Sequence, residues 1–285
     1  MIAQNFEYAA PGTLREALDL LAGEGAKPLA GGMSLIPLMK LRLSAPEQLV
    51  DLGRVAELNY IREEGGTLRI GATTTHYQVE TSPLIRSKCP LLSDTVGHIG
   101  DLQVRNMGTM GGSVAHADPA ADYPAALLAL EGRVKLVTAK SEREISLADF
   151  FVDTFTTALE PGEIIREIIV PVEDQSTGTS YHKVVQKASG FAIVGVAARV
   201  RKANGKIGMV RIGVTGLSGK AYRATNVEKA LEGTAASPAD IQKAAALVAD
   251  GVDANADLHA SANYRKQLGR VYTARALATA LSRMA

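Results

Sequence analysis

The sequence predicts an α+β protein of about two domains, and three observations lead to this prediction. The 285 residues exceed the usual length of one domain, and they are 46% apolar and 21% charged, as in ordinary globular proteins. Helical and strand patterns alternate in the first part, whereas the second part places strands first and helices last. Residues 172–180 are polar and lack periodicity, so we expect a domain boundary there.

The first predicted elements alternate between helix and strand. Thr13 and Glu16 fit a capping box that opens a helix with one apolar face. Residues 27–30 then predict a short buried strand that ends at two glycines. Ser34 can cap the next helix, and residues 48–52 predict another strand. These elements form the first of two predicted subdomains, roughly residues 1–55 and 56–175.

The second predicted subdomain contains strands and helices in mixed order. Its strand patterns are a hairpin around Gly65–Gly66 and two strongly apolar runs at residues 133–139 and 163–172. Its helical patterns lie at residues 90–100, 122–130 and 147–151. The three subsequent strands are predicted to pair as an antiparallel sheet, at residues 181–187, 191–202 and 207–217. Two helical stretches complete this C-terminal α+β domain, at residues 226–250 and 262–284.

Charge and cysteine content exclude several classes of function. The net charge of +1 gives no reason to expect nucleic acid or an anionic membrane as partner. No apolar run approaches the ~18 residues of a membrane span, and the N-terminus lacks a signal-peptide pattern, so we expect a cytoplasmic protein. Cys89 is the only cysteine, which excludes an internal disulfide and an iron–sulfur cluster held by this chain alone. It is expected to be a buried small apolar side chain rather than a catalytic one.

A metal site has one weak candidate, formed by His116, Asp118 and Asp122. No HExxH-like pair of histidines accompanies these residues. We therefore expect no metal, and we interpret His116 and Asp118 as residues that shape a loop rather than as a catalytic pair.

Two glycine pairs lie at predicted strand-to-helix corners. In the first, Gly31 and Gly32 precede Ser34, and such a corner can aim free N–H groups and the positive end of a helix at a phosphate. The absence of a Cβ would let the phosphate approach the backbone. Alone, this pattern also fits a plain turn, and it is neither a P-loop nor a GxGxxG fingerprint.

The second corner, residues 108–113 ("GTMGGS"), repeats this design about 80 residues later. Two such corners could hold two phosphates, or two sides of one pyrophosphate. Asp122 follows, and a carboxylate there suits the hydroxyl groups of a sugar, as in dinucleotide-binding folds. The alternative is that Asp122 only caps the helix that begins at Tyr123 and Pro124.

These motifs together resemble the FAD-binding medium subunit of the molybdenum hydroxylases. This family includes the carbon monoxide dehydrogenase medium chain and the FAD-binding subunits of xanthine dehydrogenase type. The resemblance extends over nearly the whole chain and is carried by "AGGMSLIPLMKLRL", "PEQLVDL", "LRIGATTTH", "RNMGTMGGSVAHADPAADYPAALLAL", "EPGEII" and "YRKQLGRVYTARAL". It implies a PCMH-type FAD-binding domain at residues 1–175 and a smaller C-terminal domain of the molybdenum-hydroxylase flavoprotein type at residues 178–285.

The resemblance also implies a set of cofactor-binding residues. Those of the two corners would hold the FAD pyrophosphate, Asp122 would contact hydroxyl groups, Ile164 and Ile165 the flavin, and Lys183 would reach the cofactor from the second domain. The corner residues are Ala30, Gly31, Gly32, Met33 and Ser34, and Thr109, Gly111, Gly112 and Ser113. The family often has His, Gln or Asn at the position of Met33, and a different sequence at Gly190–Ala192. A thioether cannot replace those side-chain hydrogen bonds, whereas backbone contacts survive the change.

The function implied is an FAD-carrying electron-transfer subunit of a heterotrimeric molybdenum hydroxylase. A large partner subunit would hold the molybdenum cofactor and a small one the 2Fe–2S clusters, as a dimer of heterotrimers. The electrons would leave to NAD, a quinone or oxygen. The alternatives are a free-standing FAD-dependent oxidoreductase of the same fold, and a non-redox scaffold whose glycine corners are only turns.

Overall fold

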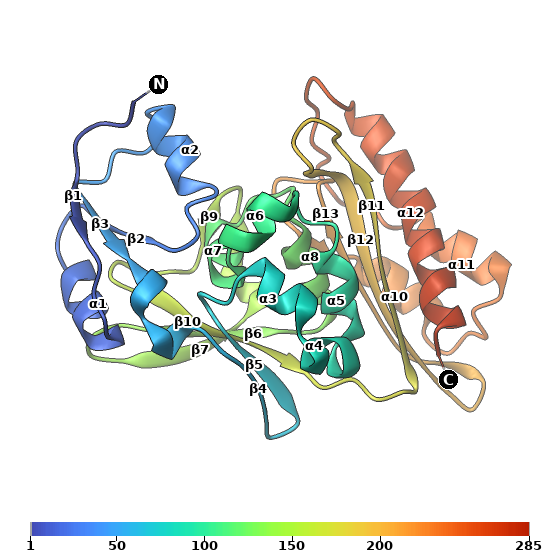
Figure 1. The fold of residues 1–285 in the computed structure, drawn as a ribbon. Helices are drawn as coiled ribbons and strands as arrows, with labels where there is room; N and C mark the ends of the chain where they lie inside the picture. The colour runs from blue at the N-terminus through green and yellow to red at the C-terminus, as the bar shows by residue number, and fades with distance from the viewer. Residues whose placement is uncertain (1, 285) are drawn as a thin grey trace.

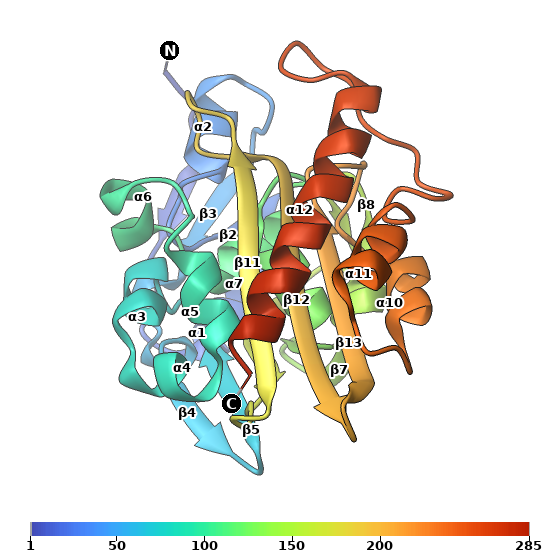
Figure 2. The same ribbon diagram turned by 90° about the vertical axis from the view of Figure 1, so that its right-hand side faces the viewer.

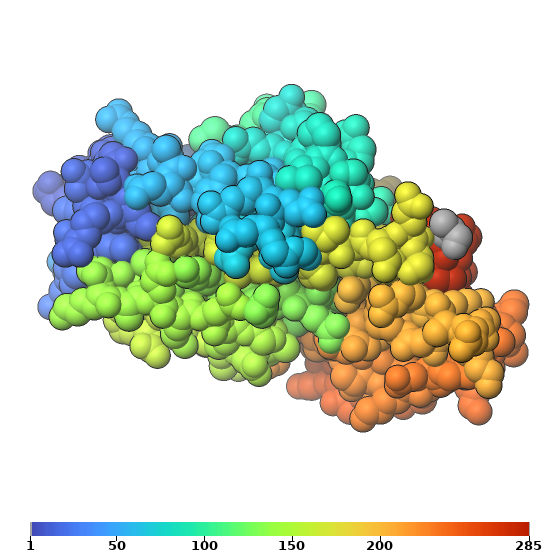
Figure 3. All heavy atoms as spheres, turned by 90° about the horizontal axis from the view of Figure 1, so that it is seen from below, coloured from blue at the N-terminus to red at the C-terminus, as the bar shows by residue number. Residues whose placement is uncertain are grey.

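The computed structural model describes residues 2–284 and arranges its elements in three parts (Figure 1). The N-terminal part (residues 7–58) holds a three-stranded sheet, the middle part (61–171) a five-stranded sheet, and the C-terminal part (177–282) a four-stranded sheet. The blue N-terminal and orange-red C-terminal residues occupy opposite ends of the molecule (Figure 3). This is an α+β arrangement, as the sequence predicts.

The N-terminal sheet is parallel, with strand order β1-β3-β2. Helix α1 (Leu14–Leu21) packs against it through the predicted apolar face. The Thr13 hydroxyl accepts a hydrogen bond from the Glu16 N–H, but the Glu16 carboxylate accepts from Gly12 instead of Thr13, so only half of the predicted capping box forms. The remaining elements are β1 (Glu7–Ala9), β2 (Ala26–Leu29), α2 (Leu35–Lys40), β3 (Gln48–Asp51), and the 3₁₀ turns η1 (Leu52–Arg54) and η2 (Ala56–Leu58).

Two local predictions around the first corner are wrong. Strand β2 was predicted to be buried, yet Lys27 and Pro28 are exposed because β2 is an edge strand of its sheet. Ser34 occupies the N-cap position of α2, but its side chain makes no capping hydrogen bond.

The middle sheet has the order β4-β5-β10-β6-β7, and every neighbouring pair is antiparallel. Strand β10 returns to the centre, where most of its side chains are buried. Strand β7 was missed by the sequence analysis. The strands are β4 (Ile61–Glu64), β5 (Thr67–Gly71), β6 (Arg133–Val137), β7 (Glu142–Ser146) and β10 (Ile164–Pro171), with the small pair β8 (Phe151–Asp153) and β9 (Thr156–Thr157).

A run of short helices connects β5 to β6 and covers the sheet (Figure 1). Cys89 lies fully buried among them, as expected for a small apolar side chain, and burial raises the pKa of its thiol to about 12. The helices of this part are α3 (His76–Thr81), α4 (Pro83–Lys88), α5 (Pro90–Val96), α6 (Leu102–Met107), α7 (Met110–His116), α8 (Asp122–Ala129) and α9 (Leu147–Phe150).

The C-terminal sheet has the order β11-β12-β13-β14, so the prediction of three strands missed the two-residue fourth. The predicted helix at 226–250 is two helices, since the chain turns at Gly233 with φ +77° and restarts at Pro238. The elements are β11 (Thr177–Val185), β12 (Ala192–Ala203), β13 (Lys206–Thr215), β14 (Tyr222–Arg223), α10 (Thr225–Leu231), α11 (Pro238–Ala245) and α12 (Ala262–Ser282).

Helices cover both faces of this sheet. On one face, α12 crosses β11 and β12 (Figure 2), and a Cβ on Gly178 would lie 1.9 Å from the Ala280 carbonyl oxygen. On the other face, α8 of the middle part lies so close that a Cβ on Gly213 would be 1.9 Å from the Ala125 carbonyl oxygen. The C-terminal sheet is therefore fixed to the helix that begins at Asp122.

Candidate functional site

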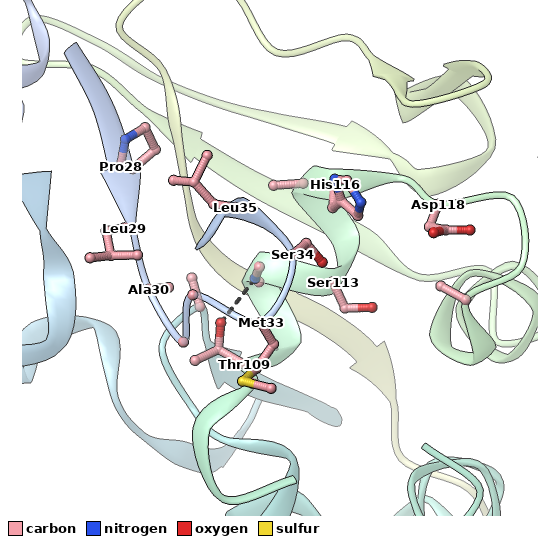
Figure 4. A pocket seen from close by; sticks show the side chains of 18 of the residues that line it. Pro28, Leu29, Ala30, Met33, Ser34, Leu35, Thr109, Ser113, His116 and Asp118 are labelled. Carbon is pink, nitrogen blue, oxygen red and sulfur yellow. Dashed lines mark hydrogen bonds between the residues drawn. The ribbon is translucent and has the colours of Figure 1, made fainter. Parts of the chain in front are cut away.

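A cavity of about 590 Å³ lies where the three parts meet. The N-terminal part lines it with the loop between β2 and α2, the middle part with α7 and the start of β10, and the C-terminal part with residues 189–191. Met33 and Ser34 of the first corner and Thr109 and Ser113 of the second face this space (Figure 4). All residues that the sequence analysis assigned to the site line the cavity except Lys183: Ala30, Gly31, Gly32, Met33, Ser34, Thr109, Gly111, Gly112, Ser113, Asp122, Ile164 and Ile165.

The first corner offers free hydrogen-bond donors. The backbone N–H groups of residues 31–34 have no acceptor within residues 2–284, although the carbonyl oxygens of Gly32 and Ser34 accept from Ile36 and Leu38. Gly32 holds φ at +71°, a conformation that suits glycine. Four consecutive N–H groups beside a cavity form a site that can bind an anion.

Gly31 of the first corner serves the contact between the two corners. A Cβ on Gly31 would lie 1.9 Å from the Met107 carbonyl oxygen and 2.7 Å from the Gly108 Cα. From the sequence, Gly31 and Gly32 are expected to let a phosphate approach the backbone. The structure shows that Gly31 is required because the backbone of residues 107–108 lies against it.

The second corner has already used most of its backbone donors. Thr109 caps α7, and its hydroxyl accepts a hydrogen bond from the Gly112 N–H at 3.1 Å, the dashed line in Figure 4. The N–H groups of Met110, Gly111 and Ser113 donate to the carbonyl oxygens of Thr74, Ala72 and Thr109. Within residues 2–284, the second corner keeps only the Thr109 N–H without an acceptor, whereas the first corner keeps the four N–H groups of residues 31–34.

The helices at the two corners are short. Helix α2 has six residues and α7 has seven, so each sums its peptide dipoles over about two turns or fewer. The predicted contribution of helix dipoles to phosphate binding is correspondingly small, and the unpaired N–H groups of residues 31–34 are the main polar feature.

Asp122 does not cap its helix, so that alternative is wrong. The N-cap position belongs to Ala121, and the Asp122 carboxylate turns toward strand β11. Its Oδ1 accepts a hydrogen bond from the Tyr181 hydroxyl at 2.6 Å, and its Oδ2 accepts from the Lys183 ammonium at 2.8 Å. Burial raises the pKa of Asp122 to about 6, against the opposing effect of the Lys183 charge.

Lys183 supports Asp122 from behind instead of lining the cavity. Its side chain is only 1% exposed, and its ammonium group also donates to the His98 carbonyl oxygen at 2.8 Å. From the resemblance, this lysine is expected to reach the cofactor. The structure shows an ion pair between β11 and α8 that holds the Asp122 carboxylate at the cavity wall.

One part of the cavity wall is apolar. Ile164 and Ile165 are buried at the start of β10, directly before a β-bulge where the pairing with β6 shifts between Ile165 and Glu167. Bulges of this kind redirect side chains near functional sites. The loop at Gly190 and Phe191 also borders the cavity, with Gly190 at φ +76°.

Several lining residues were not assigned to the site from the sequence. His76 and Thr73 follow β5, and no motif apart from the resemblance pointed to them. His116 and Asp118 also line the cavity, and Asp118 accepts a hydrogen bond from the Ala120 N–H at 2.8 Å, which shapes the loop before α8. Within residues 2–284, no three His, Cys, Asp or Glu side chains form a group that could hold a metal ion.

Comparison with known proteins identifies the family. The FAD-binding domain of molybdopterin dehydrogenases matches residues 4–173, and the CO dehydrogenase flavoprotein C-terminal domain matches residues 179–280. The chain belongs to this flavoprotein family. The carbon monoxide dehydrogenase medium chain of Hydrogenophaga pseudoflava is 38% identical over 287 residues, with 100% of both chains covered. The glyceraldehyde dehydrogenase medium chain of Sulfolobus acidocaldarius is 36% identical over 277 residues, covering 97% of this chain and 98% of the relative.

Solved structures of the family agree with the fold described above. Carbon monoxide dehydrogenase from Hydrogenophaga pseudoflava matches with a TM-score of 0.97 and 40% identity, and 100% of both chains is covered. Quinoline 2-oxidoreductase from Pseudomonas putida 86 matches with a TM-score of 0.94 and 31% identity, also over 100% of both chains. The resemblance stated from the sequence is thereby confirmed, and the chain is an oxidoreductase subunit with FAD as its cofactor.

The cavity fits a dinucleotide such as FAD. Its volume lies in the range of cofactor pockets, about 300–1,000 Å³. The unpaired N–H groups of residues 31–34 suit a pyrophosphate, and the apolar wall at Ile164 and Ile165 suits a ring system.

Among the helices of residues 2–284, none has the length and apolar character of a membrane span.

Proposed function

We propose that the chain is the electron-transfer subunit of a heterotrimeric molybdenum-containing hydroxylase. Electrons would come from the iron–sulfur clusters of a small partner subunit and leave to an external acceptor. The observation that carries the proposal is the cavity between the three parts, which combines free N–H donors with an apolar wall. Cys89 is the single cysteine of the chain and is buried. This supports placing the iron–sulfur clusters on a partner subunit, because such clusters need several thiolates.

The polar and apolar residues of the cavity have distinct parts in this proposal. The N–H groups of residues 31–34 bind the pyrophosphate, and Ile164 and Ile165 pack against the flavin and exclude water. Asp122, held by Tyr181 and Lys183, accepts hydrogen bonds from the cofactor's hydroxyl groups. When bound, the flavin supplies the redox chemistry, and the chain supplies binding and orientation.

We also propose the division of the chain into a FAD-binding domain at residues 1–175 and a C-terminal domain at 178–285. The family matches at residues 4–173 and 179–280 support this division, as does the gap between β10 and β11. The cavity needs both domains, because residues 189–191 complete its wall.

The proposed partners are a large molybdenum-cofactor subunit and a small iron–sulfur subunit, assembled as a dimer of heterotrimers. Related chains carry names that imply such complexes, among them the caffeine dehydrogenase subunit beta of a Pseudomonas species, 31% identical over 285 residues. The proposed acceptor is NAD, a quinone or oxygen.

The experiment is purification of the tagged full chain from its source organism, followed by metal analysis of the chains that accompany it. Molybdenum and iron in stoichiometric partner chains are expected, and stopped-flow reoxidation of the reduced complex by NAD⁺, a quinone or oxygen identifies the acceptor. A free-standing flavoenzyme would instead purify alone and turn over NAD(P)H by itself. That result would contradict the proposal.

A further inference from the structure

One buried polar side chain at the cavity, His76, has no hydrogen-bond partner for either ring nitrogen among residues 2–284. His76 begins α3, lines the cavity and is 4% exposed. Its Nδ1 is sealed from solvent without a hydrogen-bond partner among residues 2–284, and its Nε2 is not sealed in this way. A ligand cannot reach the sealed Nδ1, but Nε2 also has no hydrogen-bond partner among residues 2–284 and stays accessible. Because polar groups of buried side chains are nearly always paired, this accessible nitrogen indicates a partner outside the chain.

The surroundings of His76 indicate which nitrogen carries the proton. Burial, with a smaller effect of the Arg105 charge, lowers the pKa of His76 to about 4, so the ring is neutral at pH 7 and carries one N–H. A buried acceptor without a partner is tolerated more readily than a buried donor without one. We therefore assign the lone pair to the sealed Nδ1 and the proton to Nε2.

The imidazole lies where the two corners meet. A Cβ on Gly108 would be 2.7 Å from Nε2, and a Cβ on Gly31 would be 2.7 Å from the Gly108 Cα. Gly108 is thus in close contact with both the first corner and the His76 ring. The Nε2 edge of His76 borders the second corner, where the backbone N–H groups of residues 110–113 are already paired.

We propose that His76 is a cofactor-binding residue that donates a hydrogen bond from Nε2 to the pyrophosphate of bound FAD. It adds a side-chain donor beside the second corner, where the backbone N–H groups of residues 110–113 are already paired. This inference rests on the proposed FAD site. The neighbouring Tyr123, whose ring centroid lies 5.3 Å away, also has an unpaired hydroxyl, but it does not line the cavity and no ligand reaches it.

The test measures the affinity of the full chain, stripped of FAD, for FAD and for ADP, which has the pyrophosphate but no flavin. His76→Leu removes the donor, and His76→Gln keeps an N–H near the position of Nε2. Because a hydrogen bond to a charged group is among the stronger ones, His76→Leu is expected to weaken the binding of both ligands about ten- to hundredfold. His76→Gln is expected to restore most of the affinity, and the ³¹P resonances of bound FAD should move only in the leucine variant.

The matched control is Tyr123→Phe, which removes the unpaired hydroxyl beside His76. This variant should leave the affinities for FAD and for ADP unchanged. Three results would overturn the proposal: unchanged binding in His76→Leu, weaker FAD binding with unchanged ADP binding, or an equal loss in His76→Leu, His76→Gln and Tyr123→Phe. The last result would show that the imidazole acts through packing. Failure of the parent chain itself to bind FAD would refute the proposed function and this inference together.

Discussion

At the scale of single residues, Gly111 and Gly112 have different physical reasons to be glycine. A Cβ on Gly111 would lie 2.6 Å from the Ala72 carbonyl oxygen, a backbone atom that cannot move aside. A Cβ on Gly112 would meet only the Thr109 hydroxyl within 4 Å, and Gly112 lines the cavity. The first glycine is needed by the fold, and the second is available to the ligand.

We therefore expect different results from two neighbouring substitutions. Gly111→Ala should lower the free energy of unfolding by about 1–3 kcal/mol, because the core has no room for the methyl group. Gly112→Ala should cost less stability. Its Cβ would lie 2.8 Å from the Thr109 hydroxyl and disturb the cap of α7, but alanine is favoured over glycine in a helix by about 1 kcal/mol, which offsets this loss, while FAD affinity falls. Urea unfolding and FAD titration of both variants check this prediction. Equal losses of stability and of FAD affinity in the two variants would mean that the corners are simple turns.

Asp122 predicts a pH dependence of stability. Its pKa is about 6 in the folded chain against 3.8 for the free side chain, so the folded state holds its proton more tightly. The carboxyl group therefore contributes stability that is fully present below about pH 4 and is lost as the pH rises through 6. The expected loss is about 3 kcal/mol.

Urea unfolding of the FAD-free parent and of Asp122→Asn between pH 4 and 6 isolates this effect. The difference in unfolding free energy, parent minus variant, should fall across that interval. A difference that rises instead would show that Lys183 outweighs burial and depresses the pKa of Asp122. Lys183→Met should raise the pKa of Asp122 further, because the compensating charge is gone.

At the scale of elements, helix α8 connects the cavity to the C-terminal sheet. It is buried along its whole length, it begins with Asp122, and the turn after it places the Glu131 carboxylate against Arg211 at 2.8 Å and Arg223 at 3.0 Å. Gly213 lets the helix approach β13 closely. A shift of α8 would move Asp122, so the C-terminal sheet positions one wall of the cavity.

Two glycine substitutions on opposite faces of the sheet test this coupling. Gly213→Ala and Gly178→Ala would each place a Cβ 1.9 Å from a helix carbonyl oxygen, of Ala125 in α8 and Ala280 in α12. Both should lose stability by about 1–3 kcal/mol. Only Gly213→Ala should also weaken FAD binding, and equal FAD affinities in two folded variants would rule out positioning through α8.

The elements also show what sequence patterns can predict. Apolar periodicity found α1 and the long strands β10, β12 and β13, because burial of one face or both imposes that pattern. It missed β7, an edge strand of alternating charged residues, and the two-residue β14.

The site residues also fall into those that the sequence pattern predicts and those that it misses. The glycine corners could be predicted from adjacent residues in the sequence, because each is a local backbone motif. The pairing of Asp122 with Lys183, 61 positions apart, and the place of His76 beside Gly108 depend on how distant segments pack. The family resemblance indicated that Lys183 belongs to the site but not that it acts through Asp122.

At the scale of the whole molecule, the cavity belongs to all three parts. A ligand bound there should stabilise the chain as one unit. At a free FAD concentration of 100 times its dissociation constant, the expected gain is about 2.7 kcal/mol. Calorimetry should show one unfolding transition that moves to higher temperature with FAD. A second transition that FAD leaves unmoved would mean that the C-terminal part does not share in binding.

The most direct test of the central claim, that the two corners and the apolar wall form one FAD site, is the visible absorption spectrum of the purified chain. A two-banded flavin spectrum is expected, and heat denaturation should release one FAD per chain rather than FMN. A colourless chain that also fails to take up added FAD would contradict this claim.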